Sequence, residues 1–105
     1  MKHIVPAELQ KKIAAGEKLQ LIDVREAWEF ETARIEGSTL MPMGDFARRI
    51  GEIDPDSEIV VICHHGGRSM QVGALLERQG FSRITNLSGG VDAWARTVDP
   101  SMPVY

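Results

Sequence analysis

Residues 63–69 bring a thiol, two imidazoles, two glycines, a guanidinium group and a hydroxyl into one short segment. In chain order they are Cys63, His64, His65, Gly66, Gly67, Arg68 and Ser69. A cysteine thiolate is a strong nucleophile. Glycines adopt backbone angles that other residues disfavour, so successive N–H groups can crowd around one sulfur atom. The segment therefore predicts nucleophilic chemistry at Cys63. Arg68 would either bind an anionic substrate or clamp the loop through a carboxylate, and the two histidines, when protonated, would attract such a substrate.

The residues on either side of this segment strengthen the prediction. A β-branched apolar run, residues 59–62, precedes Cys63, and a helical pattern begins near Arg68. The first turn of a helix presents unpaired N–H groups and partial positive charge, which favour a thiolate over a thiol. Two other interpretations are weaker. A cysteine buried for packing needs no polar, glycine-bearing turn after it, and three consecutive residues such as Cys63, His64 and His65 rarely converge on one metal ion.

Cys63 is the only cysteine in the chain. A single thiol excludes an internal disulfide, a two-cysteine redox motif and a thiolate-rich zinc site. Any group that Cys63 acquires must therefore pass to another molecule.

The elements that position Cys63 follow from hydrophobic periodicity. Strands are expected in three apolar runs and two short edge segments: residues 19–24, 59–62, 83–87, 4–5 and 39–41. Helices are expected from Pro6 to Gly16, from an N-cap at Asp45, from about Arg68 to Gln79, and after Gly89 and Gly90. This alternation predicts an α/β fold with a mostly parallel central sheet of about five strands flanked by helices. Without repeats or linkers, residues 1–105 are expected to form one domain.

The active crevice of such a sheet lies beyond the carboxyl ends of its strands. Asp23 and Arg25 end a neighbouring strand, and we expect them to support the site by fixing that strand end through a buried ion pair or turn hydrogen bonds. Large aromatic residues are usually buried, so Trp28 and Trp94 are predicted to lie in the core. The last expectation concerns three acidic residues that resemble a solvated helix face: Glu26, Glu29 and Glu31.

The composition excludes several classes of function. The formal net charge is −3 and no run of Lys and Arg exceeds two residues, which argues against a nucleic-acid partner. No apolar run approaches the ~20 residues of a membrane-spanning helix, so no membrane partner is expected. Residues 1–6 lack the apolar stretch of a secretory signal, and we expect a cytoplasmic protein.

Three segments together resemble the rhodanese-like domain family. Residues 63–69, CHHGGRS, resemble its active-site loop, and residues 21–38 resemble its first strand-turn-helix segment through LIDVRE, WEF and IEGS. Residues 86–90, NLSGG, with Trp94, resemble its closing segment. The resemblance covers roughly residues 4 to 98. Ala33 and Arg34 depart from it, because family members usually carry Gly-His there, and we expect only a local change beside that turn.

The resemblance implies a sulfurtransferase of the thiosulfate type that needs no metal or organic cofactor. Cys63 would take the sulfane sulfur of a small anionic donor such as thiosulfate and hold it as a persulfide. The loop amides from His64 to Ser69 would stabilise that negative charge. A cyanide ion or a thiol would then accept the sulfur, and a protein could serve as donor or acceptor.

Two alternatives accompany this hypothesis. A non-catalytic rhodanese-like module would bind a partner through the same crevice, although the intact Cys63 loop speaks against it. A small cysteine phosphatase or arsenate reductase would need five residues between cysteine and arginine, whereas four separate Cys63 from Arg68. The shorter loop suits one sulfur atom better than a phosphoryl group.

Overall fold

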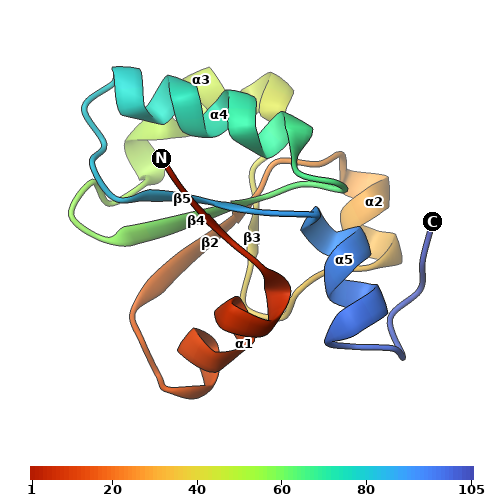
Figure 1. Ribbon diagram of the computed structural model, residues 1–105. Helices are drawn as coiled ribbons and strands as arrows, with labels where there is room; N and C mark the ends of the chain where they lie inside the picture. The colour runs from red at the N-terminus through yellow and green to blue at the C-terminus, as the bar shows by residue number, and fades with distance from the viewer.

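The computed structural model describes residues 1–105 and contains one five-stranded sheet (Figure 1). Neighbouring strands all pair in parallel, in the order β1-β5-β4-β2-β3. The strands are β1 (Lys2–Ile4), β2 (Leu19–Asp23), β3 (Thr39–Leu40), β4 (Glu58–Ile62) and β5 (Ile84–Leu87). The predicted parallel sheet of about five strands is confirmed, with β1 and β3 as its short edges.

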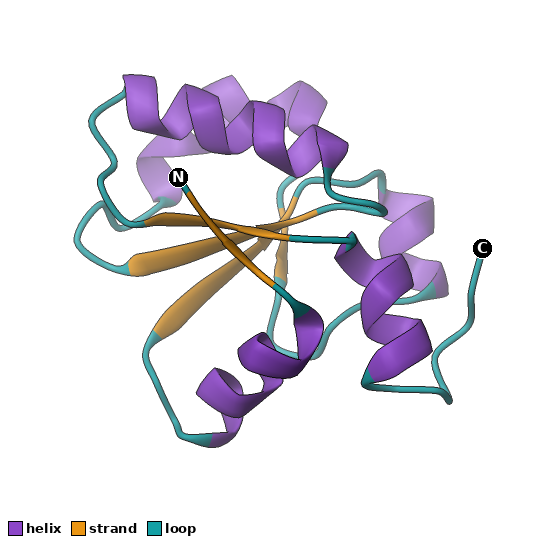
Figure 2. Cartoon of the chain, in the orientation of Figure 1, coloured by secondary structure: helices purple, strands orange, loops and turns teal.

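Helices cover both faces of this sheet, and Figure 2 shows the strands lying between two helical layers. The helices are α1 (Pro6–Ala14), α2 (Ala27–Thr32), α3 (Phe46–Arg49), α4 (Gly67–Arg78) and α5 (Gly90–Thr97). One face is covered by α3 and α4, and the other by α1 and α5. None of these helices is long and apolar enough to cross a membrane.

The central strand β4 is buried on both faces, which explains its uninterrupted apolar sequence. Ile59, Val61 and Cys63 join the hydrophobic cluster under α3 and α4. Val60 and Ile62 point the other way, into the cluster under α1 and α5. Because side chains alternate along a strand, Cys63 continues the α4 side of the sheet. The Cys63 side chain is thus positioned by the same packing that holds β4 in place.

Three predicted helices form and one is much shorter than expected. α1, α4 and α5 have the predicted positions within one or two residues. The helix expected after Asp45 is a single turn, α3, between two 3₁₀ turns, Met43–Asp45 and Ile50–Glu52. Asp45 makes no capping hydrogen bond and instead pairs with Arg48. Gly51 lies where the helix would continue, and glycine disfavours a helix interior.

Two predictions on α2 are wrong. Trp28 was expected in the core but is 60% exposed, whereas Trp94 is buried as predicted. Glu29 was expected in solvent but is 4% exposed, and only Glu26 and Glu31 face the solvent. The physical reason is that α2 makes fewer than two turns, so its inner side is set by Glu29, which ion-pairs with Arg68.

Candidate active site

The carboxyl ends of β2, β4 and β5 meet at one edge of the sheet, and each continues into a polar loop. Asp23 ends β2, Cys63 follows β4, and Gly89 and Gly90 follow β5. The predicted placement of Asp23 and Arg25 beside Cys63 therefore agrees with the strand order, since β2 pairs directly with β4.

The Cys63 thiol lies beneath its own loop, where the residue is 1% exposed. The Gly66 N–H donates to Sγ at 2.9 Å, and Ser69 Oγ lies 3.3 Å from Sγ. Ser69 Oγ also contacts the Asn86 side-chain oxygen of β5 and the Gly66 carbonyl oxygen. The other five amides of residues 64–69 donate to no backbone or side-chain acceptor. The loop is thus a ring of donors, most of which are free to bind a second anionic atom.

Backbone conformation at two glycines makes this ring possible. Gly66 has φ +111°, which side chains rarely adopt, and this angle turns its N–H toward Sγ. Gly90, with φ +59°, packs against the loop from behind, and a Cβ there would lie 2.3 Å from the Cys63 carbonyl oxygen. The α5 amides of Val91 and Asp92 donate to the Cys63 and His64 carbonyls at 2.9 and 3.0 Å. The start of α5 therefore fixes the position of Cys63.

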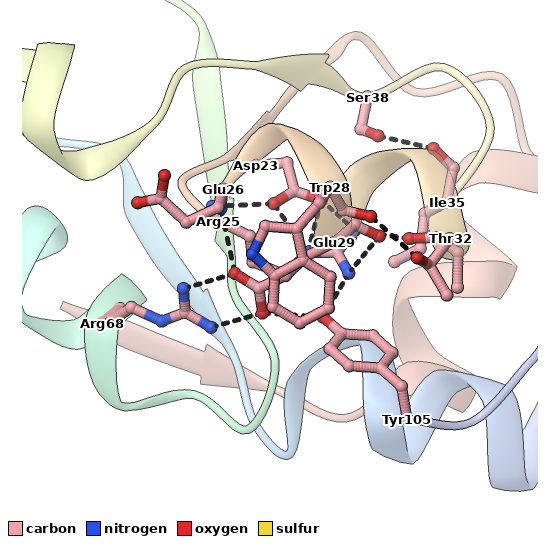
Figure 3. Close-up of polar contacts among 11 residues, drawn as sticks. Asp23, Arg25, Glu26, Trp28, Glu29, Thr32, Ile35, Ser38, Arg68 and Tyr105 are labelled. Atoms are coloured by element: carbon pink, nitrogen blue, oxygen red, sulfur yellow. Dashed lines mark hydrogen bonds and ion pairs between the residues drawn. The ribbon is translucent and has the colours of Figure 1, made fainter.

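Arg68 forms a two-pronged ion pair with Glu29 of α2. Nη1 donates to Oε1 at 2.7 Å, and Nη2 donates to Oε2 at 2.9 Å (Figure 3). This hydrogen bonding lowers the pKa of Glu29 from 4.5 to about 2 and raises the pKa of Arg68. The sequence left open whether Arg68 binds an anion or clamps the loop through a carboxylate, and in this structure it is a clamp.

The expected Asp23–Arg25 ion pair is present, and both side chains are fully buried. Arg25 Nε donates to Asp23 Oδ1 at 2.9 Å, and Nη2 donates to Oδ2 at 2.7 Å. Nη2 also donates to the Ala33 carbonyl at 2.6 Å. Arg34 turns away and lies over the Phe30 ring. The departure at residues 33 and 34 therefore leaves the polar core of the site bonded.

Tyr105 joins this site from the far end of the sequence, which no motif predicted. Its hydroxyl donates to Glu29 Oε2 at 2.9 Å and accepts from Arg25 Nη1 at 2.6 Å (Figure 3). Its ring stacks on His64 with centroids 4.1 Å apart and meets Trp28 edge-on at 5.6 Å. Tyr105 thereby links the two ion pairs to the Cys63 loop.

The two histidines of the loop differ in exposure. The His64 side chain is 18% exposed and stacks on His65, which is 69% exposed. Both Nε2 atoms face the carboxylate of Asp92 at 4.0 and 3.8 Å, and His64 Nε2 has no hydrogen-bond partner. Burial lowers the pKa of His64, and the neighbouring His65 adds to this effect. Burial and His65 therefore favour the neutral form of His64 over the protonated form that the sequence analysis considered.

A metal set of Cys63, His64 and His65 is not gathered in the structure. The ligand atoms of His64, His65 and Asp92 do lie within 4.8 Å of one another. The two imidazole rings of this group are stacked, with centroids 4.0 Å apart and an interplanar angle of 21°.

The family profile described as Rhodanese-like domain matches residues 5–97. The chain belongs to this family. The putative sulfurtransferase YtwF of Bacillus subtilis is 41% identical over 100 residues, which cover 95% of this chain and 96% of that protein. A sulfurtransferase of Allochromatium vinosum is 38% identical over 88 residues, covering 84% of this chain and 82% of its own length.

Other relatives of this rhodanese-like chain are longer. It spans 31% of the chloroplastic rhodanese-like/PpiC domain-containing protein 12 of Arabidopsis thaliana and 46% of the putative sulfur carrier protein YrkF of Bacillus subtilis. Among solved structures, a rhodanese-like domain protein from Staphylococcus aureus superposes with a TM-score of 0.86 at 28% identity. The alignment covers 100% of this chain and 99% of that one. The resemblance read from the sequence is thus confirmed.

Proposed function

We propose that this rhodanese-like chain is a sulfurtransferase that carries sulfane sulfur as a persulfide on Cys63. The observation that carries the proposal is the ring of loop amides around Sγ, of which only Gly66 N–H is already engaged by that atom. Several relatives are named sulfurtransferases, which supports a transferase role.

In the first half-reaction, the Cys63 thiolate attacks the outer sulfur of a donor such as thiosulfate. A new sulfur–sulfur bond forms on Cys63, the donor's sulfur–sulfur bond breaks, and sulfite leaves with the electron pair. The outer sulfur now carries negative charge, and free amides from residues 64–69 are positioned to donate to it. No metal or organic cofactor takes part in this step.

In the second half-reaction, a thiolate or a cyanide ion attacks the outer sulfur. The bond to Cys63 Sγ breaks, and the Cys63 thiolate returns. The chain has no second cysteine that could attack instead, so the acceptor comes from outside. Sulfur carrier and adenylyltransferase/sulfurtransferase proteins occur among the relatives, and by analogy a protein could be donor or acceptor.

Arg68 and Ser69 serve the loop rather than the substrate in this proposal. Arg68 holds α4 against Glu29, and Ser69 joins Sγ to Asn86 of β5. The clamped Arg68 also argues against the phosphatase alternative. Both terminal nitrogens already donate to the Glu29 carboxylate, so two phosphoryl oxygens would have to use the remaining N–H groups of Arg68 or displace Glu29.

Intact-mass analysis tests the proposal. Incubation with thiosulfate should add one sulfur atom to the protein, and cyanide should then remove it as thiocyanate. Cys63→Ser should gain no sulfur, and Ser101→Ala, an exposed hydroxyl in the tail, is the control that should load normally. Thiocyanate formation by the Cys63→Ser protein would refute the assignment of the nucleophile. Loading without any turnover would favour the non-catalytic binding module.

A further inference from the structure

One buried side-chain atom of the molecule has no hydrogen-bond partner, and it belongs to His64. The Nε2 atom of this ring is enclosed but makes no hydrogen bond, whereas every other buried side-chain nitrogen and oxygen has a partner. An unpaired buried polar group costs free energy, and native structures contain few of them. The position of this nitrogen therefore favours a ligand that can bond to it.

The orientation of the His64 ring is restrained by two stacked neighbours. Its centroid lies 4.1 Å from that of the Tyr105 ring and 4.0 Å from that of the His65 ring, and both contacts are nearly parallel. The unpartnered Nε2 lies 4.0 Å from Oδ1 of Asp92. Because the stacked rings limit rotation of His64, this nitrogen is kept beside the Asp92 carboxylate.

Asp92 and His65 complete a group of three ligand atoms with His64. One atom from each residue lies within 4.8 Å of the other two, and His65 Nε2 lies 3.8 Å from Asp92 Oδ2. The histidines follow β4, whereas Asp92 lies in the first turn of α5, so the fold alone brings them together. Two imidazole nitrogens and one carboxylate oxygen suit a zinc-type divalent cation, and they leave a fourth coordination position for water.

Small movements would bring these three atoms to coordination distance. Tetrahedral Zn²⁺ holds nitrogen and oxygen ligands at about 2.1 Å and thus about 3.4 Å from one another, so the group must close by on the order of 1 Å. The His65 side chain is 69% exposed and can turn without disturbing the core. Arg96, which is 61% exposed, donates to Asp92 Oδ2 at 3.0 Å and would compete with the cation for that carboxylate.

We propose that His64, His65 and Asp92 form a binding site for one zinc-type divalent cation, which joins the loop after β4 to the start of α5. The cation supplies the missing partner of His64 Nε2. The site uses neither the Cys63 thiol nor the free loop amides, so the inference does not depend on the sulfurtransferase function proposed above. Because Asp92 reaches the histidines only in the folded chain, the cation stabilises the fold.

Isothermal titration calorimetry with Zn²⁺ tests the site. The full chain carries Cys63→Ser in this experiment, because a thiolate is itself a zinc ligand. One Zn²⁺ should bind per chain and should raise the Tm, and excess Mg²⁺ should not displace it, because Mg²⁺ prefers oxygen ligands. The absence of Zn²⁺ binding at millimolar concentration, or displacement of Zn²⁺ by Mg²⁺, overturns the inference.

Variants in the same background locate the bound Zn²⁺. His65→Ala and Asp92→Asn should each weaken binding by roughly tenfold or more, since even the loss of a group behind a ligand costs that much. His3→Ala removes the remaining histidine, which lies outside the group, and should bind Zn²⁺ normally. Arg96→Gln removes the competing cation and should strengthen binding by roughly threefold.

The outcome for His65→Ala decides the matter even if Asp92→Asn folds poorly, because the His65 side chain is largely exposed. Thermal unfolding without Zn²⁺ checks that each variant is folded. Equal Zn²⁺ affinity in His65→Ala and His3→Ala would place the cation elsewhere on the protein and overturn the inference.

Discussion

Ion pairs occur at both edges of the sheet, but their burial differs greatly. At the carboxyl edge, the Arg25 and Asp23 side chains are fully buried, and the Glu29 side chain is 5% exposed where it meets Arg68, which is 32% exposed. At the amino edge, Glu58 of β4 accepts from Lys12 at 2.7 Å and faces Arg83 at 3.5 Å. Those side chains are 19%, 28% and 56% exposed. Exposed pairs contribute little to stability, whereas a buried pair fixes geometry and is costly to break.

The most deeply buried ion pairs of this fold therefore lie at the carboxyl edge of the sheet. At the carboxyl edge, the Arg68–Glu29 pair connects the start of α4 to α2, and the Asp23–Arg25 pair lies at the end of β2, beside the Cys63 loop. At the amino edge, Glu58 of β4 pairs with Lys12 of α1 and with Arg83, which precedes β5, and these residues make no contact with the Cys63 loop. Matched substitutions at the two edges should therefore lower the free energy of unfolding by different amounts, more at the carboxyl edge than at the amino edge.

The largest difference is expected between two glycines of positive φ. Gly90 at the carboxyl edge has φ +59° and no room for a Cβ, whereas Gly16 at the amino edge has φ +74° and open space around it. Gly90→Ala should lower the free energy of unfolding by roughly 4 kcal/mol and Gly16→Ala by roughly 1 kcal/mol. Urea denaturation measures both. Similar losses would mean that the contact of Gly90 with the Cys63 carbonyl is not restrictive.

The two glutamates offer the same chemical change at each edge. Glu29→Gln leaves Arg68 without its carboxylate and should cost roughly 3 kcal/mol, whereas Glu58→Gln should cost roughly 1 kcal/mol or less. Because the Cys63 loop loses its clamp, Glu29→Gln should also slow persulfide formation. Denaturation curves and loading rates report the two effects. A larger loss of stability in Glu58→Gln than in Glu29→Gln would contradict the greater importance of the carboxyl-edge ion pair.

Low pH should weaken the ion pair between Glu29 and Arg68 at the carboxyl edge. The Arg68 hydrogen bonds lower the pKa of Glu29 from 4.5 to about 2, so the folded state favours the ionised carboxylate. That contribution, up to roughly 3 kcal/mol, is present above pH 4.5 and is lost as the pH falls toward 2. The free energy of unfolding of the unmodified protein should therefore approach that of Glu29→Gln across this range. A difference in the free energy of unfolding that stays constant with pH would contradict the assignment of this pH dependence to Glu29.

The smallest difference concerns two hydroxyl groups. Tyr105→Phe keeps the ring on His64 but removes the bonds to Glu29 and Arg25, and should cost roughly 1 to 2 kcal/mol. Ser57→Ala removes a hydroxyl that accepts from Gln20 at the amino edge, at a cost of a few tenths of a kcal/mol, roughly. Thermal unfolding should rank the two variants in this order. If Ser57→Ala were the more damaging change, the tail would not stabilise the site.

The sequence predicted those features that depend on neighbours along the chain. The sequence of β4 predicts a buried strand because both of its faces are apolar, and the glycines after Cys63 predict an unusual loop conformation. The same local reasoning placed Asp23 and Arg25 correctly, since two parallel strands that pair end at the same edge.

Contacts between distant segments escaped that reasoning. The Tyr105 hydroxyl meets Glu29 across 76 positions, and no spacing rule connects a tail residue to a short helix. Trp28 was misplaced because aromatic residues are buried on average, and the orientation of a helix as short as α2 depends on its ion pair. Asp92 lies beside the histidines only because the start of α5 donates to the Cys63 and His64 carbonyls.

The strand order also has a consequence for how the protein is made. β1 has a single neighbour in the sheet, β5, so residues 2–4 find no partner until residues 84–87 have been synthesised. The α5 amides that hold the Cys63 carbonyl come later still. A ribosome-bound chain therefore carries Cys63 without its cradle from the addition of residue 63 until residues 91 and 92 have been added. During that interval no α5 amide holds the Cys63 carbonyl, so the loop can take its final shape only after α5 has been made.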